Sequence, residues 1–304
     1  MRHLPLSKRY GRWALTAAAG AAGVAPAVVA TTGAASAAPR VANVASSADP
    51  SAASLIQKLD SVPSQQRPTV VFVHGAFADT SSWSGEMQIL TAAGYKVRSI
   101  GNPLENLTTD AETVHDFLMS ISGPIVLVGH SYGGSVITNA ATGVPNVKAL
   151  VYVDAAEPAP GEMSISLAGS TSVLNTDTPA QLFTSVPYAN APAGASELYL
   201  NEDIFVHNLA NDLPVAQAEA LWAAQRGAST VAFYTPSQTA AWKTIPSWAF
   251  VSSGDQILTE SSKLAMASRA NSHVTVFQGG SHLTLISHPA AVTATIASAI
   301  TSVS

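Results

Sequence analysis

Short runs rich in apolar residues recur along the chain after residue 68. The first covers residues 69–73, with the sequence TVVFV, and is rich in β-branched side chains. Runs of this kind are typical of strands that are buried on both faces of a sheet. We therefore predict strands over residues 69–73, 95–100, 124–128, 147–153, 247–251 and 273–277.

Apolar positions with helical spacing lie in the stretches between these runs. Trp83, Met87 and Leu90 share one helical face, and the capping box Thr109-x-x-Glu112 predicts that a second helix begins at Thr109. The helices that we predict cover residues 51–60, 82–93, 109–120, 214–226, 260–269 and 289–301, together with a small-residue helix that ends near residue 142. Strands that alternate with helices predict an α/β fold with a mostly parallel sheet and helices on both of its faces.

Residues 155–246 interrupt this alternation. They hold helical stretches among loops rich in Pro, Asn and Ala, and no apolar run of the buried-strand kind. An insertion of this size between core strands predicts a helical cap over the site. The organisation that follows is a flexible lead over residues 38–67, which could hold the short helix 51–60, and a domain over residues 68–304 that carries the cap.

The first 37 residues have the layout of a secretory signal peptide. A basic start without any acidic residue precedes an apolar run over residues 13–30 and the cleavage motif Ala35-Ser36-Ala37. We therefore predict cleavage after Ala37, a secreted and extracellular protein, and no stable membrane association after cleavage. A transmembrane anchor is the alternative, and the glycines and the proline within the apolar run disfavour it.

Composition narrows the classes of function. Hydrophobic residues make up 47% of the 304 residues and charged residues 11%, which excludes a disordered chain. The absence of cysteine excludes a thiolate nucleophile and a cysteine-ligated metal. A formal net charge of −5 argues against nucleic acid as a partner. The chain also lacks His-Glu-x-x-His or a similar ligand spacing, so we expect neither a catalytic metal nor another cofactor.

The strongest chemical signal is a G-x-S-x-G motif formed by Gly129, Ser131 and Gly133. A predicted strand precedes this motif and a predicted helix follows it. A serine at such a sharp strand-to-helix turn points its hydroxyl out of the sheet, and the glycines avoid side-chain clashes within the turn. The context predicts that Ser131 is a nucleophile. A glycine-rich turn without chemistry is the alternative interpretation.

A serine nucleophile needs a general base and an acid that orients the base. His282 follows the predicted strand 273–277 in a glycine-rich loop, and Asp255 follows the predicted strand 247–251. The carboxyl ends of parallel strands meet at one edge of a sheet, so we expect both side chains to lie near Ser131. Asp154 also follows a buried strand, and it stays open as the alternative acid.

Other residues are predicted to stabilise the charge on the reacting carbonyl and to bind the substrate. Two backbone N–H groups should stabilise the oxyanion that forms during attack. We assign them to Tyr132, which follows the nucleophile, and to Ala76, in the loop after the first strand. An apolar substrate pocket is predicted from four aromatic residues, two near this loop and two in the cap: Phe77, Trp83, Phe205 and Trp222.

Four segments together resemble the α/β-hydrolase superfamily: His74-Gly75-Ala76-Phe77, GHSYGG at 129–134, Gly254-Asp255 and Gly280-Ser281-His282. HGAFADTSSW at 74–83, VYV at 151–153 and PGE at 160–162 are similar to a branch of small cofactor-free bacterial hydrolases. That branch is related to plant methyl esterases, hydroxynitrile lyases and pyrethroid-type esterases. DAAE at 154–157 departs from the apolar residues of that branch. The resemblance implies an α/β-hydrolase fold and a triad of Ser131, Asp255 and His282.

These observations lead us to expect a secreted serine hydrolase. It would cleave carboxylic esters or lactones of small to medium hydrophobic or aromatic compounds through an acyl-enzyme on Ser131. Such a small molecule is the partner we expect. Two alternatives stay open: a hydroxynitrile lyase-like or cofactor-free haloperoxidase-like activity on the same triad, and a non-catalytic binding protein on this fold. A binding protein would usually have lost one of the three residues.

Overall fold

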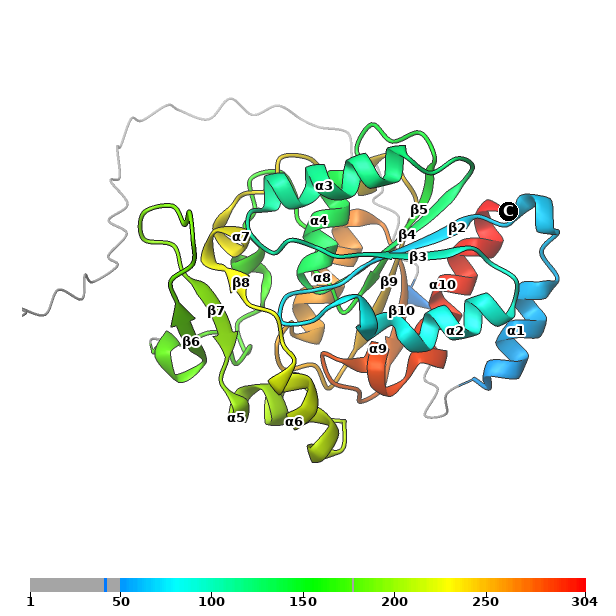
Figure 1. Cartoon of the computed structure of the whole chain (residues 1–304). Helices are drawn as coiled ribbons and strands as arrows, with labels where there is room; N and C mark the ends of the chain where they lie inside the picture. Colours follow the sequence, from blue (N-terminus) through cyan, green and yellow to red (C-terminus); the bar gives the residue numbers. More distant parts are fainter. Residues whose placement is uncertain (1–40, 43–49, 177) are drawn as a thin grey trace, which may run out of the picture. The chain divides into compact units, whose positions relative to one another are not determined.

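A parallel sheet of seven strands forms the centre of the computed structural model, which describes residues 41–42, 50–176 and 178–304 (Figure 1). The strand order is β1-β10-β9-β5-β4-β2-β3, and every neighbouring pair is parallel. The bounds are β1 Val41–Ala42, β2 Thr69–Val73, β3 Val97–Ile100, β4 Ile125–His130, β5 Val147–Val153, β9 Ser247–Ser252 and β10 His273–Phe277. The predicted signal peptide, residues 1–37, lies outside the described residues.

The apolar runs locate the strands because strands in the middle of a covered sheet have both faces dry. The side chains of β2 from residue 70 onward are fully buried, as are those of β4 up to residue 128. Some strand ends differ from the prediction: β3 begins at Val97 instead of residue 95, and β9 ends at Ser252 instead of residue 251. β4 continues through Gly129 and His130, two residues beyond its apolar run. In the lead that we predicted to be flexible, β1 pairs with β10 through Val41 beside Val274 and Ala42 beside Thr275.

Helices cover both faces of the sheet, which confirms the predicted layers (Figure 1). On one face, α1 (Ala52–Asp60), α2 (Ser84–Ala92) and α10 (Pro289–Val303) pack on one another. On the other, α3 (Leu107–Met119) packs on α4 (Tyr132–Ala140), and α8 (Glu260–Ala270) packs on β9. Among the described residues, no helix is both long and apolar enough to cross a membrane.

The start of α3 differs from the prediction. The capping box would begin the helix at Thr109, but α3 begins at Leu107 with Asn106 as its N-cap. The Asn106 side chain accepts a hydrogen bond from the N–H of Thr108 at 2.9 Å, and the Thr109 hydroxyl donates to the Asn106 carbonyl at 3.1 Å. Asparagine is among the strongest N-cap residues, so it takes the position that the serine-or-threonine pattern assigned elsewhere.

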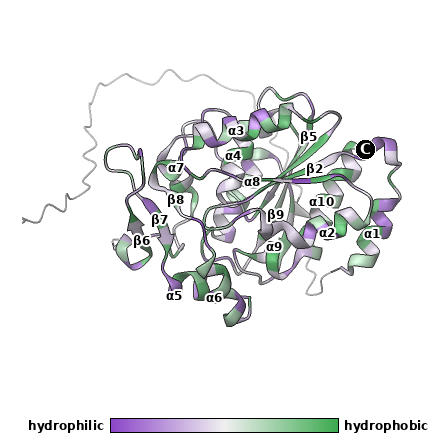
Figure 2. Cartoon of the chain, in the orientation of Figure 1, coloured by the Kyte–Doolittle hydropathy of each residue, from purple (hydrophilic) through white to green (hydrophobic). Residues whose placement is uncertain are grey.

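The cap is only partly helical, which corrects the prediction for residues 155–246. Its helices are α5 (Glu202–Ile204), α6 (Val215–Ala223) and α7 (Thr230–Tyr234), with a π turn directly after α5 and short 3₁₀ turns before α5 and after α7. They accompany an antiparallel sheet of β6 (Phe183–Val186), β7 (Glu197–Leu200) and β8 (Ala228–Ser229). Figure 2 shows α6 as largely hydrophobic, whereas α5 carries polar residues. These strands are too short and too polar to stand out as apolar runs, so they are recognised only once they pair.

Polar contacts attach the cap to loops at the carboxyl edge of the main sheet. Asp212 of the cap accepts hydrogen bonds from the Ser281 N–H at 2.9 Å and from the Ser287 hydroxyl at 2.6 Å. Arg226 donates to the Asn102 carbonyl at 2.9 Å, beyond the end of β3. The cap is therefore held on both sides of the edge at which β4, β9 and β10 end.

Candidate active site

Ser131 stands at the turn between β4 and α4, with a φ of 52° and a ψ of −124°. A residue other than glycine in this left-handed region is strained by roughly 1–3 kcal/mol, and such strain is concentrated at functional sites. The turn leaves the serine 8% exposed at the carboxyl edge of the sheet. This is the conformation that the G-x-S-x-G motif predicts.

The glycines of the motif are required by close approach of the backbone. A Cβ on Gly129 would stand 2.7 Å from the Gly133 carbonyl oxygen, and a Cβ on Gly133 would stand 2.5 Å from the Val73 carbonyl oxygen. Real Cβ atoms are almost never found so close to a backbone atom. The small residues therefore let α4 begin directly against β2, which holds Ser131 beside the loop that follows β2.

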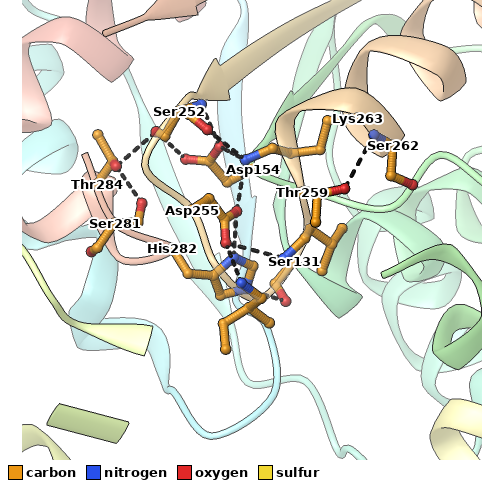
Figure 3. A network of polar contacts seen from close by, with 12 residues as sticks. Ser131, Asp154, Ser252, Asp255, Thr259, Ser262, Lys263, Ser281, His282 and Thr284 are labelled. Atoms are coloured by element: carbon orange, nitrogen blue, oxygen red, sulfur yellow. Dashed lines mark hydrogen bonds and ion pairs between the residues drawn. The ribbon is translucent and has the colours of Figure 1, made fainter. Parts of the chain in front are cut away.

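His282 lies between Ser131 and Asp255 (Figure 3). Its Nε2 is 2.8 Å from the Ser131 Oγ, and its Nδ1 is 2.9 Å from the Asp255 Oδ2. Asp255 follows β9 and His282 follows β10, so three strand ends bring these side chains together. In the tautomer that satisfies both contacts, Nδ1–H donates to the carboxylate and Nε2 accepts the serine proton.

Asp255 is surrounded by donors. Its Oδ1 accepts from the N–H groups of Ile257 and Leu258 at 2.8 and 3.0 Å, and its Oδ2 accepts from Lys263 at 2.6 Å in addition to His282. Burial by itself would raise the pKa of Asp255, but the charges of His282 and Lys263 outweigh this effect and hold the pKa well below its usual range. The carboxylate is thus ionised and fixed in one orientation.

Asp154 has no contact with His282 among those formed by the described residues. Its Oδ1 accepts from the Ser252 N–H at 2.7 Å, its Oδ2 accepts from the Ser252 hydroxyl at 2.6 Å, and the Lys263 ammonium lies 2.5 Å from Oδ1. The geometry therefore places Asp255, and not the alternative Asp154, beside the imidazole. Asp154 is joined to Asp255 through Lys263.

Lys263 is the site residue that the sequence reasoning missed. Lys263 belongs to the buried face of α8, together with Met266, Ala267 and Ala270. Those positions follow the i, i+3, i+4, i+7 spacing of a core-facing stripe. A lysine within an apolar stripe was the signal that could have identified it, because lysine is almost never fully buried without a partner.

The loop after β2 is fixed by His74. Its Nδ1–H donates to the Gly75 carbonyl at 2.8 Å, and its Nε2 accepts from the Asn102 N–H at 2.9 Å. Burial lowers the pKa of His74 to about 4, so the ring is neutral at physiological pH. A Cβ on Gly75 would stand 2.7 Å from the Ser131 Cβ. The loop that carries Ala76 therefore runs directly alongside the serine.

The two N–H groups assigned to the oxyanion are available in this arrangement. Within the described part of the chain, the N–H groups of Ala76 and Tyr132 donate to no backbone or side-chain acceptor. The Tyr132 side chain turns away from Ser131, and its hydroxyl donates to Asp110 at 2.8 Å. Only the backbone of Tyr132 is then left to face a reacting carbonyl.

His130 supports the loop that carries His282. Its Nε2–H donates to the His282 carbonyl at 2.8 Å, and the two rings are 4.8 Å apart. Burial first, and then the neighbouring His282, lower the pKa of His130 well below its usual value. A neutral His130 adds no positive charge next to the base, so His282 can become protonated without a cationic neighbour on that side.

The aromatic residues predicted to line the substrate pocket divide into two groups. Trp83 and Phe205 are only 0% and 1% exposed, which corrects the prediction, because a side chain without accessible surface cannot contact a substrate in this conformation. Trp83 packs on Phe72 and against the edge of His130 as part of the core. Trp222 is partly exposed, and its indole N–H donates to the Leu200 carbonyl within the cap.

Phe77 faces two phenylalanines of the cap that the sequence reasoning did not select. Its ring lies 5.9 Å from the ring of Phe183 and 6.1 Å from that of Phe233, measured between centroids. Both cap residues are partly exposed. The Tyr132 ring contacts the Phe233 ring edge-on, with 5.7 Å between their centroids. These aromatic rings therefore lie next to Phe77, in the loop after β2, and next to Tyr132, which follows Ser131. We name Phe77, Phe183 and Phe233 the phenylalanine cluster.

Comparison with known proteins agrees with this fold and site. Residues 70–295 match the alpha/beta hydrolase family. The chain belongs to this family. A carbendazim hydrolyzing esterase of Nocardioides sp. (strain SG-4G) is 33% identical over 111 residues, a match that covers 32% of this chain and 46% of that protein. The matched segment therefore spans about half the length of that esterase.

Solved structures of other hydrolases superpose on the chain. Polyneuridine aldehyde esterase does so with a TM-score of 0.63 at 16% identity, over 75% of this chain and 97% of that protein. A pyrethroid hydrolase from Sphingobium faniae JZ-2 does so with a TM-score of 0.58 at 21% identity, over 76% of this chain and 96% of that protein. At these identities the likeness supports the fold, and the chemistry has to be argued from this chain's own residues.

Proposed function

We propose that this hydrolase cleaves carboxylic esters, or the chemically equivalent lactones, through an acyl-enzyme on Ser131. The observation that carries the proposal is the position of His282, which contacts the Ser131 hydroxyl and the Asp255 carboxylate at the same time. A serine hydroxyl is a weak nucleophile, and a base oriented by an acid is what activates it. The esterase and hydrolase names of the similar proteins add support.

In the first half of the proposed reaction, the Ser131 Oγ attacks the ester carbonyl while His282 takes the serine proton. The negative charge that develops on the carbonyl oxygen is stabilised by the N–H groups of Ala76 and Tyr132. Asp255 stabilises the imidazolium that forms. When the tetrahedral intermediate breaks down, the C–O bond to the alcohol cleaves, and His282 returns the proton to the departing alcohol oxygen.

In the second half, water replaces the alcohol. His282 removes a proton from this water, the resulting tetrahedral intermediate expels the Ser131 Oγ, and the imidazolium gives its proton back to the serine. The carboxylic acid is released and the enzyme is regenerated. Each step uses side chains of this chain and one water molecule.

The phenylalanine cluster supports a proposal for the substrate class. Phe77 adjoins Ala76, so an acyl or alcohol group that extends from the reacting carbonyl toward the cap would meet aromatic faces. Aromatic rings pack favourably on other rings in offset or edge-to-face arrangements. We therefore propose medium-sized hydrophobic or aromatic esters as the preferred substrates.

A screen of purified protein against esters and lactones tests this function. We expect hydrolysis, with a kcat/KM about tenfold or more higher for a methyl ester of an aromatic acid than for methyl acetate, because filling an apolar pocket contributes discrimination of this order. Release of acid is followed by titration at constant pH. Cyanohydrin cleavage and halogenation assays run beside it. Activity in one of these without ester hydrolysis would contradict the proposal.

We further propose that residues 1–37 direct export of the hydrolase. The basic start, the apolar run and the Ala35-Ser36-Ala37 motif support this proposal. N-terminal sequencing of the protein from culture supernatant should begin at Ala38. Recovery in the membrane fraction with residues 13–30 retained would show an anchored protein instead.

A further inference from the structure

Lys263 is a charged residue with almost no exposed surface, behind the side chains that the mechanism uses. Its Nζ donates to the Asp154 Oδ1 at 2.5 Å, to the Asp255 Oδ2 at 2.6 Å and to the Ser252 carbonyl at 3.1 Å (Figure 3). An ammonium group has three N–H donors, and these three acceptors use all of them. All three N–H donors of Lys263 therefore bind protein groups, and none is left to bind a substrate.

The two carboxylates reach Lys263 from different parts of the sheet. Asp154 directly follows β5, Asp255 follows β9, and Lys263 itself lies in α8. Asp154 also accepts hydrogen bonds from the N–H and the hydroxyl of Ser252, at the end of β9. A single ammonium thus joins three neighbouring elements and contacts the same Asp255 oxygen, Oδ2, that contacts the His282 Nδ1.

A lysine beside Asp255 has two opposing effects on the proposed reaction. Its hydrogen bond fixes the carboxylate, which keeps the imidazole oriented. Its positive charge, however, offsets the negative charge of Asp255, and this weakens the stabilisation of the imidazolium that forms during attack. A second carboxylate on the same ammonium restores one net negative charge to the cluster.

We propose that Lys263 and Asp154 act together as positioning residues, in which Lys263 fixes Asp255 and Asp154 compensates the charge of Lys263, so that His282 faces one net negative charge. This inference rests on the proposed function. Burial would lower the pKa of Lys263, but Asp154 and Asp255 outweigh it and raise the pKa, so the ammonium stays charged. Burial also raises the pKa of Asp154, against which the Lys263 charge acts.

Other ionisable groups near the cluster leave this charge balance intact. His130, at the end of β4, is neutral because burial and His282 lower its pKa. The side chain of Glu157, the next carboxyl after β5, accepts a hydrogen bond from the Ser272 hydroxyl at 2.9 Å, and burial raises its pKa to about 8. Asp212 of the cap accepts from the Ser281 N–H on the opposite side of the His282 loop. The proposed variants therefore differ in the charges of Asp154 and Lys263, while Asp255 is the same in all of them.

The test is the pH profile of kcat/KM for ester hydrolysis in Asp154→Asn, Lys263→Met and the double variant. Loss of the Asp154 charge should move the acidic limb, on which the base becomes protonated, to lower pH by about one unit at an effective dielectric constant near 20. Loss of the Lys263 charge should move the same limb to higher pH by a similar amount. The double variant restores the net charge of −1 and should return the limb close to its wild-type position.

The two single variants should thus shift the acidic limb in opposite directions, and the shifts should cancel in the double variant. A merely structural role would lower activity without producing this pattern of shifts. Glu157→Gln is the matched control, a buried carboxyl outside the cluster, and it should leave the limb in place. If Lys263→Met fails to fold, Asp154→Asn and the double variant still differ only at Lys263, and the limb must lie at higher pH in the double variant.

Two results would overturn the inference: a limb that stays in place in Asp154→Asn, or a double variant whose limb does not return. Circular dichroism and thermal unfolding show whether each variant is folded. A wild-type protein without ester hydrolysis, or without labelling at Ser131, would instead contradict the proposed function itself. The two failures are therefore distinguishable.

Discussion

Ser131→Ala is expected to keep its fold and to lose about a million-fold in kcat on esters, the loss seen when the nucleophile of a well-studied serine protease is removed. The physical reason is that, in the part of the chain that the structure describes, no other hydroxyl contacts the His282 ring: the Ser131 Oγ is the group at 2.8 Å from Nε2. Without it, the base has no proton to take from a bound nucleophile. The measurement is steady-state hydrolysis of an ester that the wild-type protein accepts, with circular dichroism of both proteins.

Covalent labelling with a fluorophosphonate tests the same prediction independently. It should add one label to the wild-type protein, on Ser131, and none to Ser131→Ala. Ser135→Ala is the matched control, because Ser135 is also buried in α4 but bonds to Ser164 at 2.8 Å. That variant should keep both labelling and activity. Modification of another serine with parallel loss of activity would show that the nucleophile is elsewhere.

Asp255→Asn should lower kcat by at least about a thousand-fold, since a comparable change costs about ten-thousand-fold in the best-studied serine protease. An asparagine presents either an N–H or a neutral oxygen to the His282 Nδ1. The first disfavours the required tautomer, and the second leaves the imidazolium without a countercharge. Lys263 increases this effect, because its ammonium would stand beside a neutral amide with only Asp154 to balance it.

Asp154→Asn is the comparison that tests the choice of acid. Asp154 contacts Ser252 and Lys263 and does not contact His282, so its loss should cost at most about tenfold in kcat through positioning and charge. Both variants are measured with circular dichroism as a folding control. If kcat fell strongly in Asp154→Asn and only slightly in Asp255→Asn, the assignment of the acid would be reversed. Two mild variants would place the role of His282 in question as well.

Local patterns were sufficient to predict most of the core and the three side chains that meet at the candidate active site. A run of consecutive apolar residues marks a strand whose two faces are both dry, and this located β2, β4 and β9. G-x-S-x-G predicted the strained turn at Ser131 because the requirement for small residues lies within five consecutive positions. His282 and Asp255 could be selected because each directly follows a strand whose carboxyl end must lie at the same edge.

The errors arose where the deciding partner is distant in sequence. The cap strands β6, β7 and β8 are short, and each is stabilised by pairing with segments that the local pattern does not reveal. Trp83 was predicted to line the pocket because it lies near the loop that follows β2, yet its ring packs inward on Phe72. Phe183 and Phe233 come close to Phe77 only through the path of the cap.

The sequence by itself determined the α/β class, the order of the core strands along the chain and the identity of Ser131, His282 and Asp255 as candidates. These depend on periodicity and on turn chemistry, which act between near neighbours in the chain. Only the tertiary structure placed Asp255, and not Asp154, beside His282 and disclosed Lys263. Both depend on which side chains meet across β5, β9 and α8, and Lys263 and Asp154 are 109 residues apart in the chain. The cost of burying an ammonium requires that partners be found, but which partners these are is set by the packing of the elements.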